Sequence, residues 1–167
     1  MKLEKGSLFF KTLILVTLFV VTTSAIANGG NGSQESKEDI KILQSWSGDF
    51  PVARLELLPE AQRDSPVGYI DKEKTFAHVW QAFKPGETVP EVDFKTNLVL
   101  FVRNTQFYNR INIGKVKVEK GVAEVLAMET LSALPIEDKV AMSVVVVARK
   151  GLTGLKKGDT IISLPAL

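Results

Sequence analysis

Two continuous apolar runs constrain the fold of this chain more than any other feature of its sequence. Residues 97–102 read Asn-Leu-Val-Leu-Phe-Val, and residues 140–148 include four consecutive valines. Both runs have the length of a β-strand, and their β-branched and aromatic side chains favour strands. A strand with apolar residues on both faces needs cover on both, and it promotes aggregation when it lies at a sheet edge. We therefore expect both runs to form interior strands.

A hairpin with a two-residue turn is predicted at Lys120-Gly121, between these runs. Such a turn places Val118 opposite Ala123 and Lys117 opposite Glu124. Apolar residues then meet apolar residues and opposite charges meet, as cross-strand pairing favours. A shift by one residue would lose both matches, so the pattern predicts the register as well as the turn.

Farther from the turn, the apolar side of both predicted strands changes. The same register places Ile113 opposite Met128, on the face that carries Lys117 and Glu124 nearer the turn. A bulge would shift one strand only. Because both strands change at the same level, we expect the second face of the sheet to be covered there, with the predicted helix as its cover.

One helix is predicted over residues 72–83. Its apolar side chains follow the i, i+3, i+4, i+7 spacing of a buried face: Phe76, Val79, Trp80 and Phe83. We expect Asp71 to cap the N-terminus, and we expect Pro85 to end the helix because its ring disfavours helical geometry at Lys84. His78 points away from the apolar stripe and is expected to face solvent.

The remaining segments predict further short strands. We expect strands over residues 41–46, 53–58 and 160–164, and a turn-rich stretch over residues 151–159. Together the elements indicate an α+β, β-rich fold, a mainly antiparallel sheet or small sandwich with one packed helix over residues 72–83.

The first 27 residues have the pattern of a signal peptide. A basic start over residues 2–11 precedes the apolar stretch 13–21, and Ala25-Ile26-Ala27 supplies the small residues of a cleavage site. We expect cleavage after Ala27 and a periplasmic or secreted protein. The alternative is an uncleaved membrane anchor, but an anchor needs about 20 predominantly apolar residues, and the polar residues 22–24 follow the apolar stretch closely.

We expect residues 28–39 to form a flexible linker, because they contain almost no apolar side chain. We expect residues 40–167 to form a single β-rich globular domain. Removal of the signal peptide lowers the basic residues from 21 to 18 and the acidic residues from 19 to 18. The resulting formal net charge of zero argues against nucleic acid as a partner, because such binding depends on neutralising phosphates. After cleavage we expect no membrane contact.

The chain has no cysteine and one histidine, His78. Disulfides, thiolate metal sites and a cysteine nucleophile are therefore excluded, as is any site that needs two imidazoles. Phosphate-loop, calcium-loop and nucleophile-elbow motifs are absent from the sequence. We expect no enzyme activity, no metal and no cofactor. An enzyme with an unrecognised carboxylate or lysine site would instead have a concave cluster with at least two of these residues within hydrogen-bond reach of each other: Glu124, Glu129, Glu137, Asp138 and Lys139.

The strongest candidate for a functional surface is the connection after the run 97–102. Its guanidinium groups, amides and adjacent aromatic rings offer planar donors and stacking area. We expect a partner to bind these residues: Arg103, Asn104, Gln106, Phe107, Tyr108, Asn109 and Arg110. The alternative is a structural connection in which Phe107 or Tyr108 plugs the end of the sheet and the arginines are solvated or pair with local carboxylates.

Several features of residues 76–165 follow one order along the chain. They are a helix with Trp80, the segment 92–94, the run 97–102, Tyr108 and a late valine-rich strand. This order resembles the C-terminal domain of the PrcB protease-complex subunit family, which implies a small exported non-catalytic domain that attaches to protease complexes or occurs alone. Family members carry a Gly-Gly-Tyr-like turn before the hairpin strand. Residues 106–110 lack these glycines, so only Tyr108 carries over.

These observations predict an exported, non-catalytic protein-binding or complex-stabilising module. Its expected partner is another exported or envelope protein. The alternative is a small-molecule or glycan-binding domain that uses Phe107, Tyr108 and an exposed Trp46.

Overall fold

The computed structural model describes residues 37–165. The predicted signal peptide, its cleavage point after Ala27 and most of the predicted linker lie outside the described residues. The last two residues of that linker, Glu38 and Asp39, belong to a strand, so the expected domain start at Ile40 is two residues late.

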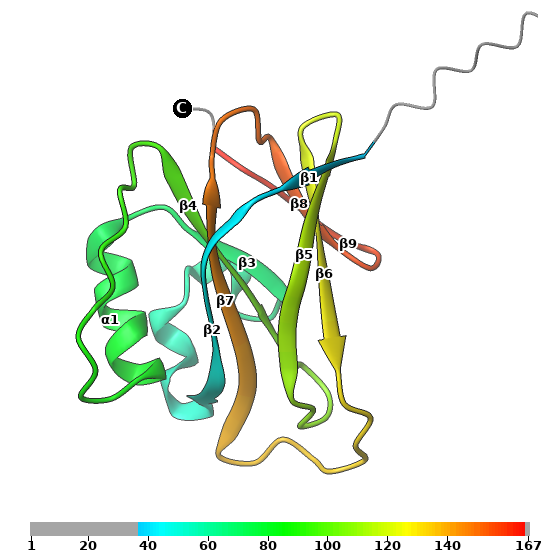
Figure 1. The fold of residues 1–167 in the computed structure, drawn as a ribbon. Coiled ribbons are helices and arrows are strands. Elements are labelled where there is room, and N and C mark those ends of the chain that lie inside the picture. The colour runs from blue at the N-terminus through cyan, green and yellow to red at the C-terminus, as the bar shows by residue number, and fades with distance from the viewer. Residues whose placement is uncertain (1–36, 166–167) are drawn as a thin grey trace, which may run out of the picture. The chain divides into compact units, whose positions relative to one another are not determined.

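The described chain forms two β-sheets and one α-helix (Figure 1). The five-stranded sheet has the order β1-β5-β6-β8-β9. Its strands are β1 (Glu38–Ile40), β5 (Ile111–Glu119), β6 (Val122–Glu129), β8 (Gly154–Lys157) and β9 (Thr160–Ser163). Only the β6–β8 pair among the described strands is parallel.

The four-stranded sheet has the order β2-β7-β4-β3 and is wholly antiparallel. Its strands are β2 (Ile42–Pro51), β7 (Lys139–Ala148), β4 (Asn97–Arg103) and β3 (Val67–Ile70). The two apolar runs of the sequence therefore form the two inner strands, which confirms the prediction. The described chain is a β-rich α+β fold with the two sheets packed as a small sandwich.

Side chains from the four-stranded sheet fill two separate cores, one on each face. Leu98 and Leu100 of β4 face the five-stranded sheet, where they meet Val116 and Val125. The alternate residues of β4 and β7 face the helix, and this second core contains Val99, Phe101, Met142, Val144 and Val146. Alternation of side chains across a strand explains why both faces of these strands had to be apolar.

Helix α1 (Glu73–Phe83) buries the predicted stripe against the four-stranded sheet, and His78 is exposed as expected. Lys84, just before Pro85, leaves the helical conformation at φ −134° and ψ 71°. The predicted cap is wrong, because the helix begins one residue later and Lys72 occupies the N-cap position without a side-chain hydrogen bond. Asp71 therefore lies one residue too early to cap it.

The predicted hairpin is confirmed, and so is its register between the turn and Lys115. Lys120 and Gly121 both have positive φ, 51° and 80°, as a two-residue hairpin turn with the twist of its strands requires. Val118 faces Ala123 and Lys117 faces Glu124.

The expectation of an unbulged hairpin is wrong. Gly114 has no partner in β6, so Ile113 faces Ala127 instead of Met128. The extra residue turns Ile111 and Ile113 of β5 into the core, whereas Met128 of β6 stays on the exposed face. Helix α1 packs on the other sheet, so it does not cover this face as expected.

Three other boundaries differ from the prediction. The expected strand 53–58 is a 3₁₀ helix (Val52–Leu57). Its Val52, Leu55 and Leu57, with the following Leu58, pack on the core between the four-stranded sheet and α1, here called the helix-side core. The expected strand 41–46 is the first half of the longer β2. The expected turn-rich stretch 151–159 includes β8, whose Leu155 is buried.

Gly68 of β3 offers a test of the close packing in this sheet. A Cβ atom at Gly68 would overlap the Phe101 ring and the Gln62 side-chain oxygen. We expect Gly68→Ala to lower the free energy of unfolding by about 2 kcal/mol, because overpacking forces neighbouring groups to move. Gly114→Ala is the control, since its Cβ would meet only the Met128 methyl at 3.9 Å. Urea denaturation measures both variants, and equal losses would contradict the packing argument.

Candidate functional site

Two connections meet at one end of the sandwich, at the bottom of Figure 1. Residues 104–110 join β4 to β5, and residues 130–138 join β6 to β7. The Tyr108 N–H donates to the Leu134 carbonyl at 3.0 Å, and the Thr130 N–H donates to the Arg110 carbonyl at 3.0 Å. We call this pair of connections the paired loops. Because backbone hydrogen bonds join them, they form one surface rather than two independent segments.

The seven residues predicted to bind a partner differ in exposure. Arg103 and Asn104 are each only 5% exposed. Tyr108 and Asn109 are half-buried, and Gln106, Phe107 and Arg110 are exposed. Arg103 is the last residue of the interior strand β4, which explains why the segment begins inside the protein.

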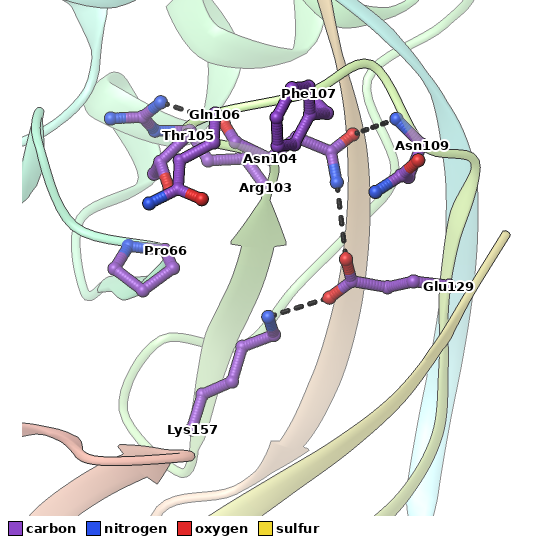
Figure 2. Close-up of a pocket in the computed structure, with 9 residues that line it drawn as sticks. All are labelled: Pro66, Arg103, Asn104, Thr105, Gln106, Phe107, Asn109, Glu129 and Lys157. Carbon is purple, nitrogen blue, oxygen red and sulfur yellow. Dashed lines mark hydrogen bonds and ion pairs between the residues drawn. The ribbon is translucent and has the colours of Figure 1, made fainter. Parts of the chain in front are cut away.

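A small hollow gathers five of the seven residues (Figure 2). We call it the donor pocket, and its volume is about 130 Å³. It is lined by Pro66, Arg103, Asn104, Thr105, Gln106, Phe107, Asn109, Glu129 and Lys157. Figure 2 shows the Glu129–Lys157 pair on one side of the hollow and Arg103 and Gln106 on the other.

Tyr108 and Arg110 do not join the donor pocket. They border a different hollow of about 340 Å³ together with Ser47, Gly48, Asp49, Ile111 and Ala141. Side chains alternate along an extended segment, which places Phe107 and Asn109 on one side and Tyr108 and Arg110 on the other. The structure therefore divides the predicted site into two surfaces.

Tyr108 is anchored by polar contacts to the ends of two strands. Its hydroxyl donates to Asp49 Oδ1 at 2.6 Å, and Lys139 Nζ lies 2.9 Å from Asp49 Oδ2. The Lys139 ammonium also lies 5.7 Å from the centre of the Tyr108 ring. Burial opposes ionisation of Asp49, but the hydrogen bonds from Tyr108 and Lys139 outweigh it and hold the pKa of the Asp49 carboxyl below its usual value. The same hydrogen bond raises the pKa of Tyr108.

The Tyr108–Asp49 contact predicts a pH-dependent stability. We expect Tyr108→Phe to lower the free energy of unfolding by about 1 kcal/mol at pH 7, a value limited by screening because the Asp49 side chain is 40% exposed. An Asp with a lowered pKa stabilises the fold above its unfolded pKa and loses that contribution as the pH falls through its folded pKa. The difference between wild type and variant is therefore expected to shrink in acid.

The raised pKa of Tyr108 makes the stability change with pH in the opposite direction. Its contribution is present below the ordinary tyrosine pKa of about 10 and is lost as the pH rises through the folded value. Urea denaturation of both proteins at pH 3, 7 and 11 measures these changes. Tyr69→Phe is the control between pH 3 and 7, because the Tyr69 hydroxyl donates no hydrogen bond within residues 37–165. It is not compared at pH 11, because burial raises the pKa of Tyr69 as well. A Tyr108→Phe loss that stays constant over this range would contradict the assignment.

Asn104 and Asn109 hold the paired loops in place. The Asn109 N–H donates to Asn104 Oδ1 at 3.1 Å, and the Ser132 N–H donates to Asn109 Oδ1 at 2.7 Å. The other end of the Asn104 amide donates to Glu129 Oε2 at 3.4 Å. These two predicted residues therefore position the loops, and their oxygens are already occupied.

The carboxylates considered as an alternative catalytic cluster bond to different partners. Glu124 pairs with Lys37 and Lys156, and Glu129 pairs with Lys157. Glu137, Asp138 and Lys139 border one shallow hollow beside Tyr108, but Lys139 pairs with Asp49. Within residues 37–165, no two of the five candidate residues bond to each other.

Trp46 is not the exposed ring that a glycan site would use. Its ring is half-buried, with its centre 4.9 Å from that of Trp80 and 6.5 Å from that of Phe76. It belongs to the helix-side core.

Sequence reasoning missed Glu129 and Lys157 as members of the pocket. Glu129 ends β6 and Lys157 ends β8, and these strands are neighbours in the five-stranded sheet. Strand β8, which the sequence pattern did not predict, places Lys157 beside Glu129 in the pocket. No local sequence pattern therefore indicated this pair.

Comparison of the chain with protein-family models, with curated proteins and with solved structures found no match. The resemblance to the PrcB family therefore stays a prediction. Across residues 37–165, no helix has the length and apolar character needed to cross a membrane. The same residues contain no group of three His, Cys, Asp or Glu side chains placed to hold a metal ion.

Proposed function

We propose that this chain is an exported, non-catalytic module that binds another protein through the paired loops. The observation that carries the proposal is the exposure of large apolar side chains on the paired loops. Leu131 is 99% exposed, Leu134 63% and Phe107 48%, and Met128 near the end of β6 is 69% exposed. Large apolar side chains exposed on ordered loops favour an interaction site, because their burial against a partner is favourable.

The paired loops also carry exposed charged side chains. Arg110, Glu137 and Asp138 are exposed on the same two connections, and neither carboxylate forms an ion pair within the described part of the chain. An apolar centre with a charged rim is the usual composition of a protein interface. The backbone hydrogen bonds between the loops also lower the entropy lost on binding, since the surface is already ordered.

The expected partner is another exported or envelope protein. Export follows from the predicted signal peptide, and the resemblance to the PrcB family supports a role in binding or stabilising a protein complex. The absence from the sequence of thiols and of a second imidazole supports a role without catalysis.

Partner binding by wild type and variants tests the proposal. A partner captured from the exported fraction is first identified by mass spectrometry and purified, and its Kd for the chain is then measured. We expect Phe107→Ser and Leu131→Ser each to raise the Kd about tenfold or more, because truncated apolar anchors commonly cost over 1 kcal/mol.

Ile161→Ser provides the matched control for these variants. Ile161 is 65% exposed on β9, outside the paired loops, so its loss is expected to leave the Kd unchanged. Equal binding by all three variants and wild type would reject the paired loops as the binding surface. A screen of glycans and metabolites by thermal shift tests the alternative of a small-molecule site at Phe107 and Tyr108, because a ligand specific for the folded state raises its apparent stability.

A further inference from the structure

The wall of the donor pocket contains a buried positive charge that forms no ion pair with a carboxylate of residues 37–165. Arg103 is 5% exposed, and its guanidinium donates to the backbone carbonyls of Asn104, at 3.1 Å, and Arg63. Its Nε is buried and has no hydrogen-bond partner within residues 37–165. Buried guanidinium groups are normally paired with an anion, because a buried charge without one is costly. Burial lowers the pKa of Arg103, and of the carboxylates only Asp64 opposes this effect.

Further donors lie around the same hollow. The Thr105 hydroxyl and the Gln106 amide form no hydrogen bond with any residue of the described chain. Lys157 Nζ donates to Glu129 Oε1 at 2.7 Å, and among the described residues that line the pocket Glu129 alone has a carboxylate. Two cations and one carboxylate give the described lining residues one excess positive charge, which Asp64 outside the lining offsets in part.

The contacts of Glu129 indicate that these donors suit a carboxylate. One of its oxygens accepts from Lys157 and the other accepts from the Asn104 amide (Figure 2). Among the described residues that line the pocket, none supplies a carboxylate on the far side, at Arg103 and Gln106. A second carboxylate placed there would meet the Gln106 amide and the Thr105 hydroxyl beside the positive charge of Arg103, and it would offset that charge.

We propose that the donor pocket binds a carboxylate of the partner polypeptide, supplied by an acidic side chain or by the C-terminus of its chain. This inference rests on the proposed function. The volume of about 130 Å³ suits a group of a few heavy atoms and is below that of most small-molecule sites, which begin near 300 Å³. Phe107 belongs both to the pocket and to the exposed apolar surface, so a partner on the paired loops reaches the pocket.

Three small probes test the proposal by NMR on the full-length ¹⁵N-labelled chain. N-acetylglycine represents a C-terminal carboxylate, N-acetylaspartate α-amide represents an acidic side chain, and N-acetylglycinamide is the neutral control. We expect at least one carboxylate to shift the amide signals of residues 104–107 in a saturable way, while the neutral probe leaves them in place. The stronger carboxylate identifies the source of the group. Absence of saturable shifts with both carboxylates, or equal shifts with the neutral probe, overturns the proposal.

Charge variants with opposite expected effects sharpen this test without removing the buried Arg103. Glu129→Gln is expected to tighten binding of the carboxylate probe about tenfold, because it removes the competing negative charge. Lys157→Gln is expected to weaken binding by a similar factor. Lys156→Gln is the control, because Lys156 lines no part of this pocket and pairs with Glu124 instead. Binding that Glu129→Gln leaves unchanged or weakens overturns the proposal.

The same variants separate this inference from the proposed function. In the binding assay with the purified partner, Lys157→Gln is expected to raise the Kd, whereas Lys156→Gln is not. If Phe107→Ser weakens partner binding but no carboxylate probe binds, the inference is wrong and the proposed function stands. If a carboxylate binds but Phe107→Ser and Leu131→Ser leave partner binding intact, the proposed role of the paired loops is wrong.

Discussion

Burial of the four-stranded sheet on both faces is the constraint on which the rest of the described structure depends. Leu98 and Leu100 pack toward the second sheet, while Val99 and Phe101 of the same strand pack toward helix α1. Each large apolar side chain contributes roughly 1.5–3 kcal/mol when it leaves water. The helix and the five-stranded sheet are therefore both held by the same two inner strands, because either face left open would expose a continuous apolar surface.

This arrangement also decides the character of the candidate site. Strand β4 ends inside the protein at Arg103, so the connection that follows begins among buried groups and reaches solvent only at Thr105. Farther along the connection, the Tyr108 hydroxyl donates to Asp49 of β2, and Asp49 pairs with Lys139 of β7. These contacts attach the segment to the ends of both strands. The exposed part around Phe107 lies between two fixed points and is paired with a second loop. A surface held in this way loses little conformational freedom when it binds.

The charged groups on the two sides of the 104–110 connection differ in their bonding partners. On the Tyr108 side, the Asp49 carboxylate accepts a hydrogen bond from one neighbour and pairs with the ammonium of another, so the group is satisfied within the chain. On the Arg103 side, the guanidinium donates to backbone carbonyl oxygens, and the carboxylate of Glu129 accepts from other donors. The first side is thus complete as a structural contact, whereas the second has spare donor capacity. This difference separates the anchoring surface from the surface suited to an anionic group.

The sequence by itself determined the features that local spacing encodes. These are the two inner strands, the register beside Lys120-Gly121, the buried stripe of α1 and the outward position of His78. The tertiary structure alone decided the bulge at Gly114, the strand β8 and the meeting of Glu129 and Lys157 with the 103–109 segment. The physical reason is that periodicity records which side of an element is apolar. Which strands become neighbours, and hence which charges share a pocket, follows from how the cores pack.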